Sequence, residues 1–185
     1  SDIGISTLPA LKPIKNEKAL FKSAAMVTDK VISDGKIPVY LGGEHTITAA
    51  IVSALKKHYS DFSILHFDAH SDLRNTYGGT KYSHACVMRR VYEMCVPIVS
   101  VGIRSQSSEE HEFIAGAEGS PLHIFYMHEI HNDKGWIKNV TDKLGKNIYI
   151  SFDVDVFDPA YLRATGTPEP DGLSWKQVVD LLKAV

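Results

Sequence analysis

The chain has 185 residues, of which 44% are hydrophobic and 23% charged, and its formal net charge is −2. This composition argues against a disordered chain, and the small net charge argues against a broad basic surface for nucleic acid. No apolar run approaches the roughly 18 residues that a membrane-spanning helix needs. We therefore expect one folded domain with a sizeable core, and neither a nucleic-acid partner nor a membrane.

Apolar periodicity divides the chain into strand-like and helix-like runs. In chain order it predicts a strand at 37–41, a helix at 46–58, a strand at 62–67, a helix at 83–94, a strand at 98–101, a helix capped by Ser107 and ending at 113, a strand at 124–127, a helix at 134–144, a strand at 147–154 and a helix at 173–185 entered through Ser174. This alternation predicts an α/β fold with three layers, α/β/α, around a mostly parallel sheet.

Neither end of the chain shows the features of a natural terminus. Residues 1–20 show no period and read as a connecting segment, and the last helix stops at Val185 without a glycine cap. We expect a single domain over residues 1–185 that is incomplete at both ends, with roughly 50–80 further residues on each side.

Two cysteines, Cys86 and Cys95, lie in an apolar helical pattern and are too few for a disulfide framework. We expect buried thiols in a reducing compartment, and hence a cytoplasmic location.

Three polar clusters follow predicted strands, where parallel sheets place their functional sites. In chain order they are Gly42-Gly43-Glu44-His45-Thr46, Asp68-Ala69-His70-Ser71-Asp72 and Asp153-Val154-Asp155. Alternate residues of an extended chain point to one side, so the polar residues of the second and third clusters are each expected to converge. A lone histidine or Asp-x-His would more often be structural, but three such clusters in order are hard to obtain by chance.

The clusters combine four carboxylates with two imidazoles, a set that repels itself strongly unless cations are bound. Oxygen-rich ligands with some imidazole suit Mn²⁺, or Fe²⁺ and Co²⁺, better than a structural zinc site. Six ligands would leave a single ion little room for a reactive water, so two ions bridged by carboxylates are expected. Water bound to such ions becomes a nucleophile near neutral pH.

These motifs resemble the ureohydrolases, the family that includes arginase, agmatinase, guanidinobutyrase and formiminoglutamase. The segments that carry the resemblance are Gly42-Gly43-Glu44-His45, Phe67-Asp68-Ala69-His70-Ser71-Asp72, Ser151-Phe152-Asp153-Val154-Asp155 with Asp158-Pro159, and Gly166-Thr167-Pro168-Glu169-Pro170. The resemblance covers most of the chain and implies an arginase-like fold with two Mn²⁺ ions per chain.

The resemblance also assigns the ligands. It implies one ion held by His45, Asp68, Asp72 and Asp153, and the other by Asp68, His70, Asp153 and Asp155, with Asp68 and Asp153 bridging. A metal-activated hydroxide would attack the guanidinium carbon, and collapse of the resulting intermediate would release urea and an amine. His84 matches a family histidine that faces the cleft and protonates that amine.

The other histidines are expected to play no part as ligands. His66 shares a face with Asp68 one step deeper in its strand, which favours packing or support of the site over ligation. Glu44 has the opposite parity to His45 and is not expected to bind metal. The remaining five are expected to be solvated or structural, namely His58, His111, His123, His128 and His131.

The substrate is expected to be a small guanidino compound. Arg74 stands where arginases place an asparagine, and the surrounding residues resemble agmatinases, so we expect agmatine, then guanidinobutyrate, then arginine. Arg74 is expected to point away from the substrate amine or to pair with an acid. If Arg74 instead faces the pocket, a carboxylate substrate becomes attractive. The resemblance also implies a homo-oligomer, a trimer or hexamer.

Two departures keep alternatives open. The family glutamate that pairs with the guanidinium has no match, and the family's glycine-rich N-terminal segment is not recognisable in residues 1–20. The alternatives are a single-zinc deacetylase of the same fold, and a non-catalytic homologue or fragment. The pairs Asp68/Asp72 and Asp153/Asp155 favour two metals over one.

Overall fold

The computed structural model describes residues 4–11 and 16–185. Its four strands form one parallel sheet in the order β3-β2-β1-β4: β1 Ser63–Phe67, β2 Ile98–Ile103, β3 Leu122–Tyr126 and β4 Ile148–Phe152. The α-helices are α1 Glu17–Ser33, α2 Ile47–Leu55, α3 Val87–Glu93, α4 Ser108–Gly116, α5 Met127–Ile130, α6 Trp136–Thr141 and α7 Trp175–Ala184. Two short 3-10 turns are η1 His84–Cys86 and η2 Val154–Val156.

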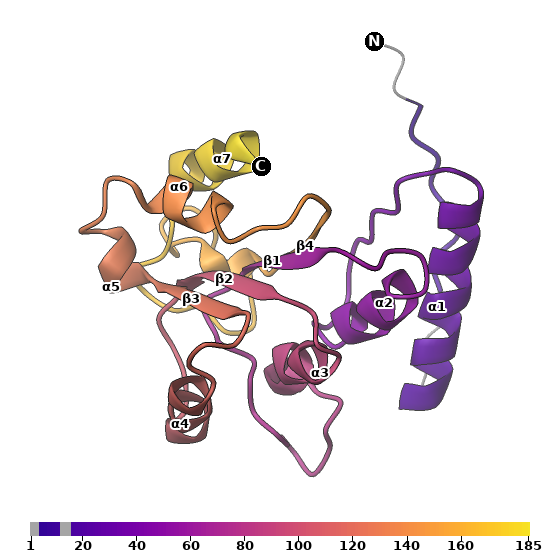
Figure 1. Ribbon diagram of the computed structural model, residues 1–185, viewed down its shortest axis with the longest axis horizontal. Helices are drawn as coiled ribbons and strands as arrows, with labels where there is room; N and C mark the ends of the chain where they lie inside the picture. Colours follow the sequence, from indigo (N-terminus) through magenta and orange to yellow (C-terminus); the bar gives the residue numbers. More distant parts are fainter. Residues whose placement is uncertain (1–3, 12–15) are drawn as a thin grey trace.

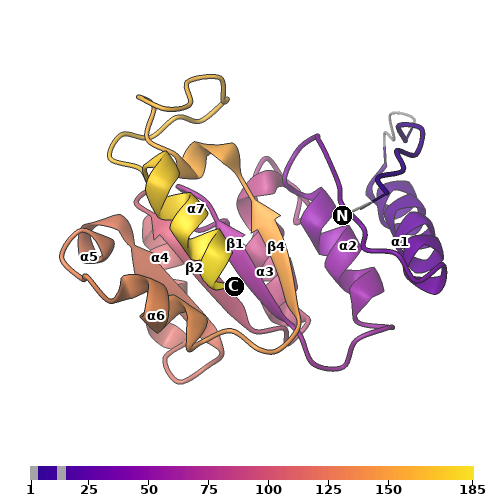
Figure 2. The same ribbon diagram turned by 90° about the horizontal axis from the view of Figure 1, so that it is seen from above.

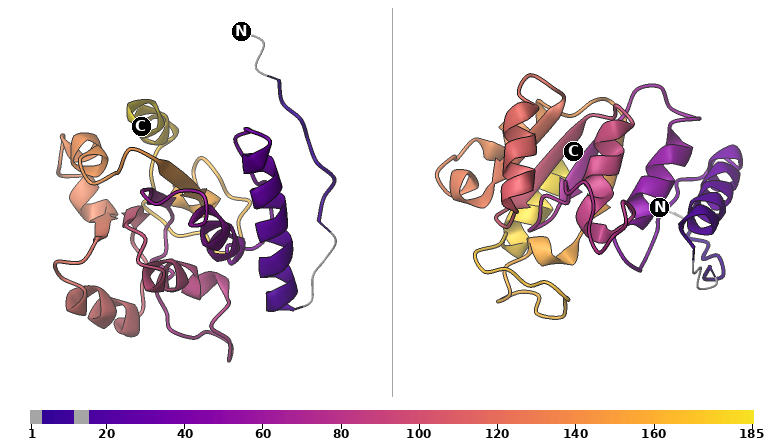
Figure 3. Two further views of the ribbon diagram at one scale, coloured as in Figure 1. Left: turned by 45° about the vertical axis from the view of Figure 1, so that its right-hand side comes forward. Right: turned by 90° about the horizontal axis from the view of Figure 1, so that it is seen from below.

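Helices cover both faces of the sheet (Figure 1). From above, α5, α6 and α7 lie in front of the sheet, whereas α3 and α4 lie in front in the opposite view (Figures 2 and 3). Successive strand residues serve the two layers, since Ile64 packs with α2 and α3 while Leu65 packs with α6 and α7. Every residue of β1 and β2 is buried. The predicted three-layer α/β/α fold is confirmed.

Most predicted elements are present with shifted ends. Ser107 and Ser174 begin α4 and α7 as predicted, each in a capping box with the residue three positions on, Glu110 and Gln177. No helix of the described residues has the length and apolar character needed to cross a membrane.

The predicted strand at 37–41 is wrong. This segment forms no helix or strand, and Ile37, Val39 and Leu41 are 90%, 79% and 95% exposed. Its continuous apolar pattern is typical of a strand buried on both faces, but among the described residues no strand lies beside it to supply hydrogen bonds. A local apolar pattern does not show whether a neighbouring strand is present to pair with the segment.

Two further expectations need correction. The connecting segment expected at residues 1–20 lies partly outside the described residues, and its last part, from Glu17, is the first turn of α1, which begins at the cap Asn16. Cys86 is buried as expected, but Cys95 is exposed in the turn after α3. Both thiols are free.

Candidate metal centre

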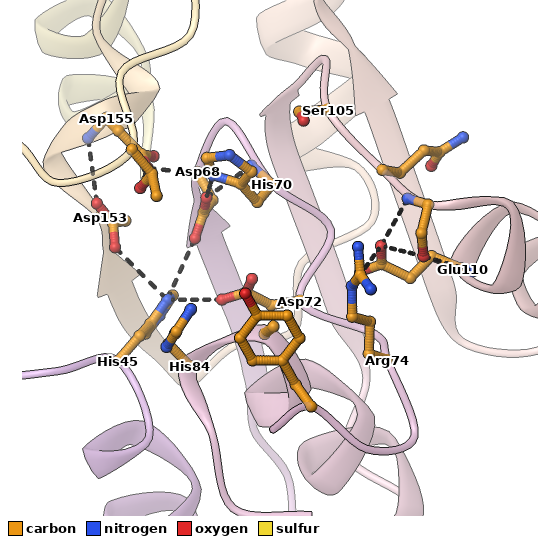
Figure 4. Close-up of a pocket in the computed structure, with 15 residues that line it drawn as sticks. His45, Asp68, His70, Asp72, Arg74, His84, Ser105, Glu110, Asp153 and Asp155 are labelled. Atoms are coloured by element: carbon orange, nitrogen blue, oxygen red, sulfur yellow. Dashed lines mark hydrogen bonds and ion pairs between the residues drawn. The ribbon is translucent and has the colours of Figure 1, made fainter. Parts of the chain in front are cut away.

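The three polar clusters meet at the carboxyl end of the sheet (Figure 4). One follows β1, one follows β4, and His45 stands just before α2. Together they line one side of a cavity of about 230 Å³. All six residues predicted as metal ligands line this cavity, namely His45, Asp68, His70, Asp72, Asp153 and Asp155.

A first group of possible ligands surrounds the imidazole of His45. Its Nδ1 atom lies 3.0 Å from Asp72 Oδ2, 3.2 Å from Asp68 Oδ2 and 3.7 Å from Asp153 Oδ2. The side chains of His45, Asp68 and Asp72 are almost fully buried, whereas Asp153 is 30% exposed towards the cavity. Three carboxylate oxygens and one ring nitrogen thus converge on a small volume.

A second group lies on the other side of Asp68. His70 Nδ1 is 3.1 Å from Asp155 Oδ2 and 3.4 Å from Asp68 Oδ1. Asp68 therefore directs Oδ2 to the first group and Oδ1 to the second, the arrangement of a carboxylate that bridges two cations. Asp153 directs only Oδ2 to the first group, because its Oδ1 accepts the backbone N–H of Asp155 at 3.1 Å.

The convergence does not arise from the extended alternation that the sequence suggested. β1 ends at Phe67, and Asp72 has a left-handed backbone with φ of 54°. β4 ends at Phe152, after which Asp153 caps the turn η2 that carries Asp155. Left-handed backbone at a non-glycine residue is costly and is often found at functional sites.

The electrostatics of the cluster are those of a cation site. Burial and the charge of Asp68 raise the pKa of Asp72 to about 7, and the same two causes raise the pKa of Asp153. Burial also disfavours charge on Asp68, but the imidazoles of His45, His66 and His70 around it outweigh this effect and hold the Asp68 pKa well below its usual range. Hydrogen bonding to Asp155 and Asp68 raises the pKa of His70 to about 10, because the two carboxylates favour a positive charge beside them.

The imidazole of His45 tests whether these residues fit a metal ion. Its Nδ1 atom is buried and makes no properly aligned hydrogen bond within the described residues. Its Nε2 atom lies 2.8 Å from Ser151 Oγ, which is itself 3.0 Å from Thr48 Oγ1. The ring is therefore fixed from behind with Nδ1 directed at three carboxylates, as expected of a metal-binding histidine. The donor set fits divalent cations that prefer oxygen with some nitrogen.

His66 supports the cluster and is not free to join it. Its Nε2 atom lies 2.9 Å from Asp68 Oδ2, and its Nδ1 atom lies 3.0 Å from Ser100 Oγ. Both ring nitrogens are thus occupied, although His66 lies close enough to the first group to be counted with it. This placement agrees with the supporting position expected from the sequence.

His84 stands at the mouth of the cavity. Its Nδ1 atom is 3.3 Å from Glu44 Oε1, and its ring packs edge-on against Tyr77 at 5.4 Å. Glu44 also accepts a hydrogen bond from the Thr46 hydroxyl at 2.6 Å, and it lies outside both ligand groups. The side chain of His84 is 49% exposed, which leaves it accessible to a ligand in the cavity.

The five histidines expected to be structural stay outside both ligand groups. His58 and His131 each pair with a single carboxylate, of Asp29 and Asp171 respectively, both at 2.8 Å. Sequence reasoning had foreseen no partner for them.

Several residues of the site were missed by sequence reasoning. Thr167 donates to Asp155 Oδ2 at 2.9 Å, and Glu169 Oε1 lies 3.5 Å from His70 Nε2. The Gly166–Pro170 stretch was identified from the sequence as resembling a family loop, but neither Thr167 nor Glu169 was singled out as a residue of the site. Arg104 was not singled out, because nothing near it in the sequence signals the carbonyl groups that it binds.

Arg74 does both things that the sequence left open. It lines the cavity, and its Nε atom lies 3.8 Å from Glu110 Oε2, while its guanidinium lies over the Tyr77 ring. Glu110 is buried and accepts the backbone N–H of Leu73 at 2.9 Å. The negative charge of Glu110 offsets the positive charge of Arg74 at this wall of the cavity.

Comparisons with known proteins identify the family. A sequence model described as "Arginase family" matches residues 1–185. The chain belongs to the arginase family. Consistent with this, it is 41% identical over 151 residues to an N(1)-aminopropylagmatine ureohydrolase of Thermus thermophilus, covering 82% of this chain and 50% of that protein. It is 36% identical over 176 residues to an agmatinase of Bacillus anthracis, covering 94% and 58%.

Solved structures agree with the arginase-family assignment. The agmatine ureohydrolase of Thermoplasma volcanium superimposes with a TM-score of 0.83 and 37% sequence identity, covering 95% of this chain and 59% of that one. The chain thus spans about half to three-fifths of the length of the relatives it matches. Membership of the arginase family rules against the deacetylase alternative.

Proposed function

We propose that the chain carries the centre of a binuclear Mn²⁺ hydrolase, which cleaves agmatine to putrescine and urea. The observation that carries this proposal is the division of Asp68 between two groups of ligands, Oδ2 with His45 and Asp72, and Oδ1 with His70 and Asp155. Two ions sharing one carboxylate fit this arrangement better than one. When bound, such ions supply a water of lowered pKa as the nucleophile.

The reaction balances as a hydrolysis. The C–N bond between the guanidinium carbon of the substrate and the nitrogen of its alkyl chain breaks. The oxygen of water becomes the carbonyl oxygen of urea, and the leaving nitrogen takes up a proton. We assign that proton transfer to His84, whose imidazole stands at the cavity mouth. Glu44 holds its Nδ1 atom, which leaves Nε2 to exchange the proton.

The charges of the cavity support an amine-bearing substrate. Carboxylates dominate the metal side, and on the opposite wall Arg74 is offset by Glu110. A cationic tail therefore meets no uncompensated positive charge. N(1)-aminopropylagmatine is a second candidate, because three relatives named for it are 33–41% identical to this chain. Guanidinobutyrate and arginine follow.

The expected setting is a cytoplasmic homo-oligomer, a trimer or hexamer. Two free thiols fit a reducing compartment, and the oligomer rests on the family resemblance. Light scattering of the purified protein measures the assembly.

Urea release from Mn²⁺-loaded full-length protein tests the function. We expect kcat/KM to be highest for agmatine or its aminopropyl derivative, and lower for guanidinobutyrate and arginine. A higher value for arginine would overturn the substrate assignment. Folded, Mn²⁺-loaded protein that releases no urea from any of the four would support the non-catalytic alternative.

A further inference from the structure

Arg104 follows β2 directly, and within the described residues each hydrogen bond from its side chain goes to a backbone carbonyl group. Its Nη2 donates to the carbonyl of Asp155 at 2.7 Å and to that of Glu169 at 2.9 Å, and its Nε donates to Pro170 at 2.8 Å. Longer or additional bonds reach the carbonyls of Gly102, Val156 and Phe157. One guanidinium thus joins three stretches of chain: the end of β2, the turn η2 and the 166–170 loop.

Other hydrogen bonds also hold these stretches, among them the Gly172 N–H to Asp158 Oδ2 at 3.2 Å and the bridge between Phe157 and Leu173, but regular secondary structure is scarce. Residues 157–174 form no helix or strand, although they connect β4 to α7 at the carboxyl end of the sheet (Figure 2). Backbone carbonyls removed from water need donors, and the planar fork of arginine supplies five in a fixed geometry. A lysine would offer three donors on a flexible stem and could not serve the same set.

Gly172 lies against the guanidinium of Arg104, where there is no space for a side chain. A Cβ atom at Gly172 would lie 2.7 Å from Arg104 Nη2 and 2.4 Å from the backbone nitrogen of Asp158. Side chains larger than hydrogen are therefore excluded where the loop passes Arg104. Arg104 is thus closely packed within the set of backbone carbonyls that it binds, which we call the carbonyl cage.

Two of the carbonyl groups that Arg104 binds belong to Asp155 and Glu169, which lie at one half of the metal centre. Asp155 and Glu169 both direct their side chains at His70, whose Nδ1 and Nε2 atoms lie 3.1 and 3.5 Å away. The other half, around His45 and Asp72, makes no contact with Arg104 among the described residues.

We infer that Arg104 is a positioning residue for one of the two metal positions, the one formed by His70, Asp155 and Asp68 Oδ1. By fixing the backbone carbonyls of Asp155 and Glu169, Arg104 orients two carboxylates. That of Asp155 faces the ion, and that of Glu169 lies beside Nε2 of His70. This role rests on the proposed binuclear centre. It predicts that the two metal positions depend unequally on a residue that touches neither.

The test is Arg104→Lys in the full-length protein, with Mn²⁺ counted by elemental analysis after desalting and binding followed by calorimetry. We expect the wild type to retain two ions and the variant to retain one, with the lost ion bound about 10–100-fold more weakly, the usual effect of removing support from behind a ligand. The paramagnetic resonance signal should change from a spin-coupled pair to an isolated Mn²⁺. Activity is not needed for this measurement.

Arg90→Lys is the matched control. Arg90 is also buried and binds through its guanidinium, to Asn75 and Glu93, but it lies outside the cage. It should leave both ions in place. Equal weakening of both ions in Arg104→Lys, retention of both, or loss of the folded state would overturn the inference. A wild type that binds fewer than two ions would instead refute the proposed function.

Discussion

The buried imidazole of His66 donates its Nε2–H to Asp68 Oδ2 at 2.9 Å, on the oxygen that also faces His45 and Asp72. The acceptor is a carboxylate, so the shared proton belongs to His66. Burial lowers the His66 pKa and favours the neutral ring, whose Nδ1 then accepts from the Ser100 hydroxyl at 3.0 Å. This hydrogen-bonded path runs from Ser100 through His66 to Asp68 Oδ2. It fixes the orientation of the one carboxylate shared by both groups.

The His66–Asp68 bond predicts a ranking of variants at position 66. His66→Phe removes the donor and should weaken Mn²⁺ binding about 10–100-fold, whereas His66→Gln keeps a donor at the same number of bonds from Cα and should recover most of the affinity. Calorimetric titration with Mn²⁺ measures both. Ser63→Ala is the control, because Ser63 is a buried β1 serine whose hydroxyl, in the part of the chain that the structure describes, accepts from the Gly145 backbone N–H alone. If His66→Gln is as weak as His66→Phe, His66 is itself a ligand.

Because the two carboxylate oxygens of Asp68 face different ligand groups, we predict that replacing Asp68 removes more metal than replacing Asp72. Asp68→Ala should remove both ions, because Oδ1 and Oδ2 serve different groups, whereas Asp72→Ala should remove only the ion beside His45. Elemental analysis of desalted protein counts the ions. Asp142→Asn, at an exposed ion pair with Lys138, should change nothing. Retention of two ions in Asp68→Ala would contradict the shared-carboxylate arrangement.

His84 should matter for turnover but not for metal. His84→Ala should lower kcat by about 10²–10⁴-fold, the range for a general acid or base, with two Mn²⁺ still bound. The metal count separates this from damage to the centre. His58→Ala removes an exposed histidine that pairs with Asp29, and it should leave kcat unchanged. Unchanged turnover in His84→Ala would make that residue structural.

The sequence predicted those elements whose apolar pattern or capping residue is sufficient to define them. β1 and β2 are mostly apolar and are buried on both faces, and Ser107 and Ser174 mark their helices by capping. The segment at 37–41 has the same apolar pattern but no neighbouring strand among the described residues. Strand pairing is a long-range property that no local pattern encodes.

The six clustered residues could also be predicted, but not the way they converge. Strand alternation suggested straight extension after β1, whereas Asp72 reaches the cluster through left-handed backbone. Arg104, Thr167 and Glu169 act through contacts with residues distant in sequence, such as the 2.9 Å bond from Thr167 to Asp155. Short-range spacing carries no trace of such contacts.

Gly102 should be essential for stability. Its φ is +95°, and an added Cβ would lie 2.6 Å from Val156 Cγ2 and 3.1 Å from the Asp68 carbonyl. Gly102→Ala should therefore lower the free energy of unfolding by about 1–3 kcal/mol, measured by urea denaturation. Gly116→Ala is the control, because that helical position has open space and should gain about 0.5–1 kcal/mol. Equal stability of the two variants would contradict the close approach of β2 to η2.

Arg74 provides the test of substrate charge. If it is engaged by Glu110, as the 3.8 Å separation indicates, Arg74→Met should change kcat/KM for agmatine by less than about 3-fold, well under the worth of one charged hydrogen bond. If Arg74 instead grips a carboxylate tail, its loss should cost guanidinobutyrate roughly 10–100-fold, the equivalent of about 1.5–3 kcal/mol. Urea release with each compound distinguishes the two. A wild type that prefers guanidinobutyrate, together with a selective loss of that activity in Arg74→Met, would reassign Arg74 to substrate binding and make the substrate an acid.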